Sequence, residues 1–293
     1  MPLLGAHVST AGGVSRGLER AEQIRCEAAQ IFAKNNKCWV EGPLHPEEVG
    51  RFRDRSNRFG RNTLVSHAGY LINLAAGDPD IHRRSMDSMH DELCRAESLG
   101  LSWVVLHPGS HGGRGEEWGI RQIIQSLQTI LDRTRKFHVG ILLETTAGQG
   151  NSIGWKFEHL SAIRRHLNPK RRVGVCVDTC HIFAAGYELR TRAGYESTMT
   201  ALDRTVGIGV VKLIHLNDSM KGLGSRVDRH QHIGQGEIGL AAFRFLLNDP
   251  RFAGLPMVLE TPKGPDMKED IMNLAVLRKL LRRGARKKLA ATA

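Results

Sequence analysis

The sequence predicts a single (β/α)8 barrel, also called a TIM barrel, from three observations. Six short apolar runs are rich in β-branched residues, which is typical of buried parallel strands. Each run stops on a histidine or an acidic residue, and neighbouring stops lie 34 to 45 residues apart, which is enough for one strand, one helix and two loops. A chain of 293 residues is an ordinary length for one such barrel. The six stops are His67, His107, Glu144, Asp178, His215 and Glu260.

Two more strands, expected at 3–8 and 28–32, bring the number to eight. The intervals between the strands carry helical patterns. The clearest is 80–99, whose apolar residues recur at three- and four-residue steps before Gly100, a residue that favours the end of a helix. The helices are expected at about 13–25, 46–59, 80–99, 116–136, 155–167, 195–206, 240–248 and 267–283.

Alternation of strands with helices specifies either a closed parallel barrel or a doubly wound sheet. The even spacing and the metal-type side chains at the strand ends favour the barrel, because its strand ends converge on one face that carries the active site. No linker rich in proline or serine divides the chain. We therefore expect one barrel domain over 1–283 and a basic C-terminal tail over 284–293.

The net charge of +12 is concentrated near the C-terminus. Residues 278–288 hold seven cations and no acid, so removing them lowers the net charge to +5. A basic surface favours polyanions such as nucleic acid. A solvated last helix followed by a frayed tail explains the same run of charge equally well.

The composition also indicates a cellular compartment. No apolar stretch approaches membrane-spanning length, and the N-terminus has neither the basic nor the long apolar region of a signal peptide. Five cysteines form no recognisable framework, which indicates free thiols and a reducing compartment. Cys176 and Cys180 flank Asp178, but we expect buried thiols there in preference to zinc ligands. The chain is therefore expected in the cytoplasm, with no membrane partner.

The six strand-end residues predict a metal centre. Burying several acids and imidazoles without a cation costs several kcal/mol per unpaired charge, and a divalent metal removes that cost. Three more candidates lie just downstream of strand ends, namely His181, Asp228 and His230. Nine donors, five of them histidines, exceed what one ion takes and suit two or three metals sharing a bridging carboxylate. Mixed imidazole and carboxylate ligands suit zinc, with manganese or iron as alternatives.

Several motifs follow one another along the chain from residue 5 to about residue 262. The two most specific are Gly174-Val-Cys-Val-Asp-Thr-Cys-His181 and His215-Leu-Asn-Asp-Ser219, the latter with the Asp228-Arg-His230 that follows. The opening Gly5-Ala-His-Val-Ser9 and the segments that begin at His107, Glu144 and Glu260 belong to the same set. In this order, the motifs resemble those of the endonuclease IV family of apurinic/apyrimidinic endonucleases.

The resemblance implies a trinuclear zinc site, with Mn2+ possible at one position. His67 and His107 would hold one zinc and share Glu144 with a second, which Asp178, His215 and Glu260 would complete. His181, Asp228 and His230 would hold the third. The implied reaction is hydrolysis of the phosphodiester 5′ to an abasic site in double-stranded DNA, leaving a 3′-hydroxyl and a 5′-deoxyribose phosphate. Glu144, Asp178 and Glu260 would be the catalytic carboxylates, with Glu260 also orienting water.

The same resemblance implies a role in base excision repair, acting as a monomer associated with the nucleoid through DNA. It also places DNA contacts on two early loops. Lys37, Tyr70 and Leu71 would enter the duplex at the lesion, and Asn35 would contact the backbone. The family more often has arginine where Lys37 stands, and lysine gives a point charge instead of a planar fork. Ordinary packing is the alternative for Tyr70 and Leu71. A wedge that unstacks DNA acts more easily where a base is missing, which favours abasic sites.

A metal-dependent sugar isomerase or epimerase on the same barrel is the rival function, because fold alone does not separate the two. Such enzymes typically need one or two metals held mainly by carboxylates, so five histidines favour the nuclease. His7, His111 and His232 lie near the expected site and are left open as supporting residues. The remaining histidines, in helical or surface contexts, are expected to be solvated: His45, His82, His90, His138, His159 and His166.

Overall fold

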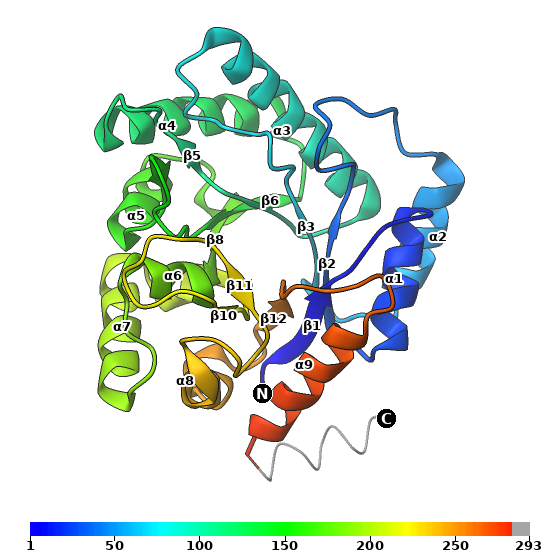
Figure 1. Cartoon of the computed structure of the whole chain (residues 1–293). Coiled ribbons are helices and arrows are strands. Elements are labelled where there is room, and N and C mark those ends of the chain that lie inside the picture. Colours follow the sequence, from blue (N-terminus) through cyan, green and yellow to red (C-terminus); the bar gives the residue numbers. More distant parts are fainter. Residues whose placement is uncertain (283–293) are drawn as a thin grey trace.

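The structure, a computed structural model, describes residues 1–282, so the predicted tail and most of the basic segment lie outside the described residues. Eight parallel strands close into a barrel in the order β1-β12-β9-β8-β6-β4-β3-β2, which confirms the predicted fold (Figure 1). All eight expected strands are present. They are β1 (Leu3–His7), β2 (Ala28–Phe32), β3 (Leu64–His67), β4 (Trp103–Leu106), β6 (Gly140–Glu144), β8 (Val173–Asp178), β9 (Val211–His215) and β12 (Pro256–Leu259).

Helices form an outer ring around the strands, as Figure 1 shows. The eight expected helices are present with ends shifted by a few residues: α1 (Val14–Gln23), α2 (Pro46–Ser56), α3 (Pro79–Leu99), α4 (Glu116–Arg133), α5 (Phe157–Arg165), α7 (Arg192–Thr205), α8 (Gly239–Leu247) and α9 (Lys268–Leu280). A further short helix, α6 (Thr179–Ala185), was not predicted. Its first six residues are all buried, so it has no alternation of polar and apolar faces to reveal it.

Helix α3 shows why the sequence signals worked. The Asp78 side chain accepts hydrogen bonds from the backbone N–H groups of Asp80 and Ile81, and Pro79 occupies the first turn, so the helix begins there. Gly100 ends it in the left-handed conformation, with φ of 75°. The apolar stripe that includes Met89 is buried, as expected of core packing.

The barrel interior positions the site. One buried residue from each of seven strands fills the interior as a separate apolar cluster: Ala28, Val65, Val105, Leu142, Cys176, Leu213 and Val258. Side chains alternate between the two faces of a strand, so residues two positions further along also point inward. Those residues are Gln30, His67, His107, Glu144, Asp178, His215 and Glu260. Strand alternation therefore stacks a polar layer directly above an apolar one.

Two small two-stranded sheets rise from the loops after the strand ends. β5 (Gly109–Ser110) pairs with β7 (Ser152–Ile153), and β10 (Asp218–Ser219) pairs with β11 (His230–Gln231), both antiparallel. The Asp218 carboxylate is buried and accepts hydrogen bonds from the backbone N–H groups of Gly234, Gly236 and Ile238. These bonds hold the β10–β11 hairpin over the barrel. Among residues 1–282, no helix is both long and apolar enough to cross a membrane.

Candidate metal centre

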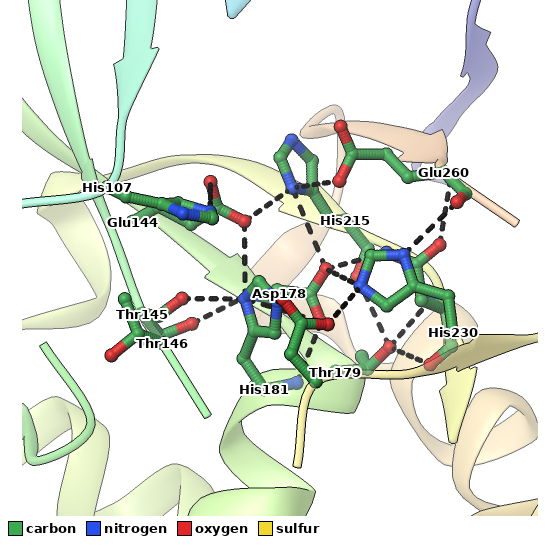
Figure 2. Close-up of polar contacts among 12 residues, drawn as sticks. His107, Glu144, Thr145, Thr146, Asp178, Thr179, His181, His215, His230 and Glu260 are labelled. Atoms are coloured by element: carbon green, nitrogen blue, oxygen red, sulfur yellow. Dashed lines mark hydrogen bonds and ion pairs between the residues drawn. The ribbon is translucent and has the colours of Figure 1, made fainter. Parts of the chain in front are cut away.

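Glu144, at the end of β6, lies at the centre of the polar layer. Its Oε2 is 3.1 Å from Nε2 of His67 and 3.1 Å from Nε2 of His107, and its Oε1 is 2.8 Å from Nδ1 of His215. The carboxylate is fully buried. Figure 2 shows it between His107 on one side and His215 on the other, in the place of a bridging ligand.

His215 Nδ1 faces three carboxylates. Besides Glu144, it lies 3.0 Å from Oε2 of Glu260 and 3.7 Å from Oδ2 of Asp178. The donor atoms of these four residues all lie within 4.8 Å of one another, which is close enough for one ion to contact all of them. The same is true of the group formed by His67, His107 and Glu144.

A third group comes from α6 and the β10–β11 hairpin. The Asp178 side chain caps α6 by accepting from the backbone N–H of His181, so one turn of helix returns the imidazole to the same place. Asp228 Oδ2 lies 3.1 Å from Nε2 of His181, and its Oδ1 lies 3.3 Å from Nε2 of His230. The structure thus brings together all nine donors selected from the sequence.

The hydrogen bonds of four histidines test whether these residues fit a metal. Each histidine places one ring nitrogen against an oxygen that only accepts, so that nitrogen carries the proton. The bonds run from His67 Nδ1 to the carbonyl of Ala68 (2.7 Å), from His181 Nδ1 to the carbonyl of Thr145 (2.8 Å), from His230 Nδ1 to the carbonyl of Glu260 (3.1 Å) and from His215 Nε2 to Oε1 of Gln30 (2.9 Å).

In the neutral form that can bind a metal, the second nitrogen of each ring directs its lone pair at a carboxylate oxygen. Nε2 of both His181 and His230 is buried without a hydrogen-bond partner. Lone pairs of nitrogen and oxygen repel at these distances. Protonating the rings instead would place positive charges close together. The ring centroids of His181 and His230 are 5.4 Å apart, and those of His67 and His215 are 6.2 Å apart. Divalent cations remove both conflicts, so the donor set fits zinc.

Charge coupling within the cluster is strong. Burial opposes the charged form of His181, but Asp178 and Asp228 outweigh it and hold the pKa well above its usual value. Burial likewise raises the pKa of the Glu144 and Glu260 carboxyls, but the neighbouring His215 has the larger, opposite effect. Both pKa values therefore fall well below the usual value. For Asp228 the neighbouring His181 outweighs burial and lowers the pKa to about 2. The carboxylates are therefore ionised and ready to bind a cation at neutral pH.

Three supporting residues went unnoticed in the sequence. Gln30 donates from Nε2 to Glu260 and accepts from His215, so it fixes which nitrogen of His215 faces the carboxylates. Asn217 donates to Oδ2 of Asp178 (2.6 Å) and accepts from the backbone N–H of Glu260 (2.8 Å). Thr145 Oγ1 accepts from the backbone N–H of Asp178 (2.9 Å). For Gln30 a signal existed, because it lies two residues beyond an interior position on a strand.

The two cysteines beside Asp178 are buried thiols, as expected. Cys176 belongs to the apolar interior, and burial raises the pKa of both Cys176 and Cys180 to about 12. Their sulfur atoms approach candidate ligands, but a protonated thiol is a poor ligand beside ionised carboxylates. All five cysteines are free.

The predicted DNA-contact residues lie on two loops beside the cluster. Tyr70 is 64% exposed and its ring centroid is 6.0 Å from that of His67, while Leu71 is 37% exposed. The Tyr70 side chain is thus mostly exposed, although its ring also meets Phe32 and His67 edge-on. Asn35 and Lys37 are exposed on the loop after β2, where the Asn35 side chain accepts from the backbone N–H of Lys37. An open cleft of about 590 Å³ lies between Tyr70 and the cluster.

The remaining histidines gave mixed outcomes. His159 was expected to be solvated, and this is wrong: it is buried, accepts from the backbone N–H of Gly154 and pairs with Glu116 at 3.2 Å. The helical pattern of α5 hid the fact that this histidine lies on the inward face. His7 does support the site, with Nδ1 3.1 Å from Oε1 of Glu260. His111 instead accepts from the backbone N–H of Gly115.

Comparison with known proteins extends these findings. A family described as the xylose isomerase-like TIM barrel matches residues 18–280. The chain is 51% identical over 281 residues to the probable endonuclease 4 of Chloroflexus aurantiacus, which covers 96% of this chain and 99% of that protein. The crystal structure of endonuclease IV from Thermus thermophilus superposes with a TM-score of 0.84 at 39% identity, covering 95% and 98% of the two chains.

A D-tagatose 3-epimerase-like protein also superposes, with a TM-score of 0.73 over 98% of this chain and 99% of that one, but at 17% identity. That likeness shows the shared barrel and no more. The identities with the two endonucleases, 51% and 39%, are much higher and extend over nearly the whole chain. The chain belongs to the endonuclease IV family.

Proposed function

We propose that this protein is a DNA repair endonuclease that hydrolyses the phosphodiester 5′ to an abasic site in double-stranded DNA. It would leave a 3′-hydroxyl and a 5′-deoxyribose phosphate, and would use about three zinc ions per chain, with Mn2+ possible at one position. The observation that carries the proposal is the cluster of histidine lone pairs and ionised carboxylates facing one another at the mouth of the barrel.

The resemblance to the family divides the ligands into three groups, and two of these match donor sets that lie close together here. His67 and His107 would bind one ion and share Glu144 with the second, which Asp178, His215 and Glu260 would complete. His181, Asp228 and His230 would bind the third. Zinc bound here would polarise the phosphate and make water a better nucleophile at neutral pH.

The chain's own residues orient the reaction. Among the three carboxylates around His215, Glu260 reaches furthest toward solvent. Its side chain is 15% exposed, whereas the side chains of Glu144 and Asp178 are fully buried. It would therefore orient the attacking water, while Gln30 and His7 hold its Oε1. Glu144 and Asp178 would fix the ligand geometry from below.

Recognition of the lesion would come from the exposed loops. The Tyr70 ring stands beside the cluster with Phe32 behind it, the ring centroids being 5.5 Å apart. Tyr70 and Leu71 would fill the gap left by the missing base, where unstacking costs least. Lys37 would enter the duplex with them as a point charge, and Asn35 would contact the backbone as a hydrogen-bonding group.

The direct test is incision of a duplex that carries one tetrahydrofuran abasic analogue. We expect a single cut 5′ to the lesion, with a 3′-hydroxyl that a polymerase extends, and no cut in the undamaged duplex. Absence of incision by protein loaded with zinc would overturn the proposal. Epimerisation of a ketohexose by the same preparation would support the sugar-enzyme alternative.

Replacing Tyr70 by alanine tests the wedge. Stacking of one aromatic ring contributes about 1–3 kcal/mol, so we expect Tyr70→Ala to weaken binding to abasic duplex by about 10- to 100-fold and to undamaged duplex much less. The Tyr70→Phe variant keeps the ring and should bind as the parent protein does. Equal losses on both duplexes, measured by fluorescence anisotropy, would mean that Tyr70 is not a lesion wedge.

A further inference from the structure

Helix α3 carries a group of polar residues that the metal centre does not use. Its apolar stripe packs on the barrel, but Ser88, Asp91, Glu92 and Arg95 face the two loops that precede α2 and α3. We call these four residues the α3 ridge. Glu92 is 1% exposed and Arg95 is 5% exposed. Burying such groups is costly unless they are paired, so their partners indicate what the ridge does.

The first partner is the loop after β2. Lys34, which is itself buried, donates from Nζ to Oγ of Ser88 at 2.7 Å and to Oδ2 of Asp91 at 3.3 Å. The same Nζ donates to the carbonyl of Trp39 at 3.3 Å. Asn35 and Lys37, two of the predicted DNA contacts, lie between Lys34 and Trp39. The ridge therefore holds Lys34, and Lys34 in turn holds the far end of the segment at Trp39.

Arg95 fixes the continuation of this loop. Its Nη2 donates to the carbonyls of Glu41 at 2.7 Å and of Gly42 at 2.6 Å, while its Nε donates to Asp91 at 2.8 Å. The Glu41 side chain in turn accepts from the backbone N–H of Asn35 at 2.6 Å. The loop from residue 34 to residue 42 is thus tied to one helix at several points.

The second partner is the loop after β3. Glu92 Oε1 accepts from the backbone N–H of Gly69 at 3.1 Å, and Nζ of Lys34 lies 3.8 Å from the same oxygen. Gly69 immediately precedes Tyr70, whose own N–H donates to the carbonyl of Asn36 at 3.2 Å. One buried carboxylate therefore joins the loop bearing the wedge to the loop bearing the backbone contacts.

The protonation of Glu92 agrees with this role. Burial raises its pKa, and although Lys34 and the Gly69 N–H act against it, the pKa still rises to about 7. Strongly perturbed pKa values are more common at functional sites than elsewhere in proteins. Within residues 1–282, the hydrogen bonds of the ridge go to the loops and to Asp91, and none goes to the nine metal-ligand candidates.

We propose that Glu92 and Lys34 are positioning residues that hold the Tyr70 loop and the Asn35–Lys37 loop in their DNA-binding arrangement before DNA arrives. This inference rests on the proposed function. Its physical basis is preorganisation, because loops ordered in advance need not be ordered during binding. The effect belongs to lesion binding, and the reaction of bound DNA should not depend on it.

The test replaces the buried pair together, as Lys34→Met with Glu92→Leu, so that neither charge is left unpaired. We expect zinc content and kcat at saturating abasic duplex to stay within about twofold of the parent, while KM and the Kd for abasic duplex rise about tenfold, the effect of ordering a few loop side chains on binding. Affinity for undamaged duplex should change little. The matched control is Asp87→Leu. Asp87 lies on α3, as Glu92 does, and its replacement breaks a surface ion pair with Arg133 of α4.

A readout beyond stability comes from the Tyr70→Ala background, where the double replacement should weaken binding by clearly less than in the parent, because one of the two groups that it positions is gone. If the pair replacement does not fold, Glu92→Gln is measured instead, and it should raise the Kd for abasic duplex about threefold, since the acceptor for Gly69 remains. An unchanged Kd, equal losses on both duplexes, or full additivity with Tyr70→Ala would overturn the proposal. If Tyr70→Ala itself lacks an effect, the wedge hypothesis fails instead, and the two failures are distinguishable.

Discussion

Replacing Glu260 by glutamine is expected to lower kcat for incision of abasic duplex by about 10²–10⁴-fold, the range for loss of a group that moves or orients a proton. The substitution keeps the shape of the side chain and removes its charge. Oε2 then no longer offers an anion beside His215, at 3.0 Å, and the attacking water loses its orienting acceptor. The change should leave the fold intact, because the apolar interior below the site is untouched.

The matched control is Glu117→Gln, which makes the same chemical change on a side chain that is 93% exposed at the start of α4. It should incise at the parent rate. Single-turnover rates for both variants, with circular dichroism to confirm folding, complete the test. A Glu260→Gln protein with the parent rate would remove this carboxylate from the mechanism.

Removing the metals with a chelator is expected to abolish incision and to destabilise the protein. Ions bound only by the folded chain stabilise it by about 2.7 kcal/mol at 100 times Kd, so we expect Tm to fall by about 5–10 °C. Added zinc should restore both Tm and incision. Full activity after exhaustive dialysis against the chelator, with no metal detected, would contradict the metal centre.

The chelated protein should also show an inverted pH dependence. Without cations, the pKa values of His181 and His215 lie well above 6.5, because neighbouring groups outweigh burial. These groups are Asp178 and Asp228 at His181, and Cys176, Glu260 and Glu144 at His215. A raised pKa contributes stability that is complete below the unfolded value and is lost as pH rises through the folded value. Chelated protein should therefore lose Tm above neutral pH, whereas zinc-loaded protein should lose it on acidification, because protons compete for the ligands.

Six of the nine donors were predictable because they lie at strand ends. Alternation along a strand and closure of the barrel together aim a residue such as Glu144 or His215 at one point, whatever the loops do. Gln30 obeys the same rule and lies in the same layer. It was missed because a neutral amide carries no metal signal, although its partners show that it sets the tautomer of His215.

The other three donors depend on structure that sequence patterns do not reveal. His181 reaches the site because Asp178 caps a helix of seven residues, which lacks a polar face. Asp228 and His230 arrive on a hairpin whose strands are two residues long, too short for any alternation. For these the resemblance to a known family supplied the grouping. The α3 ridge had no sequence signal, since burial of Lys34 and Glu92 follows from loops folding over a helix that looks solvated there.

The metal content of protein purified without added metal tests the central claim most directly. Mass spectrometry of the metals, with the protein quantified by amino-acid analysis, should give about three zinc ions per chain, and His181→Ala should lower the count by about one. A parent protein that holds one ion or none, and gains none when zinc is supplied, would contradict the trinuclear centre on which the proposed reaction depends.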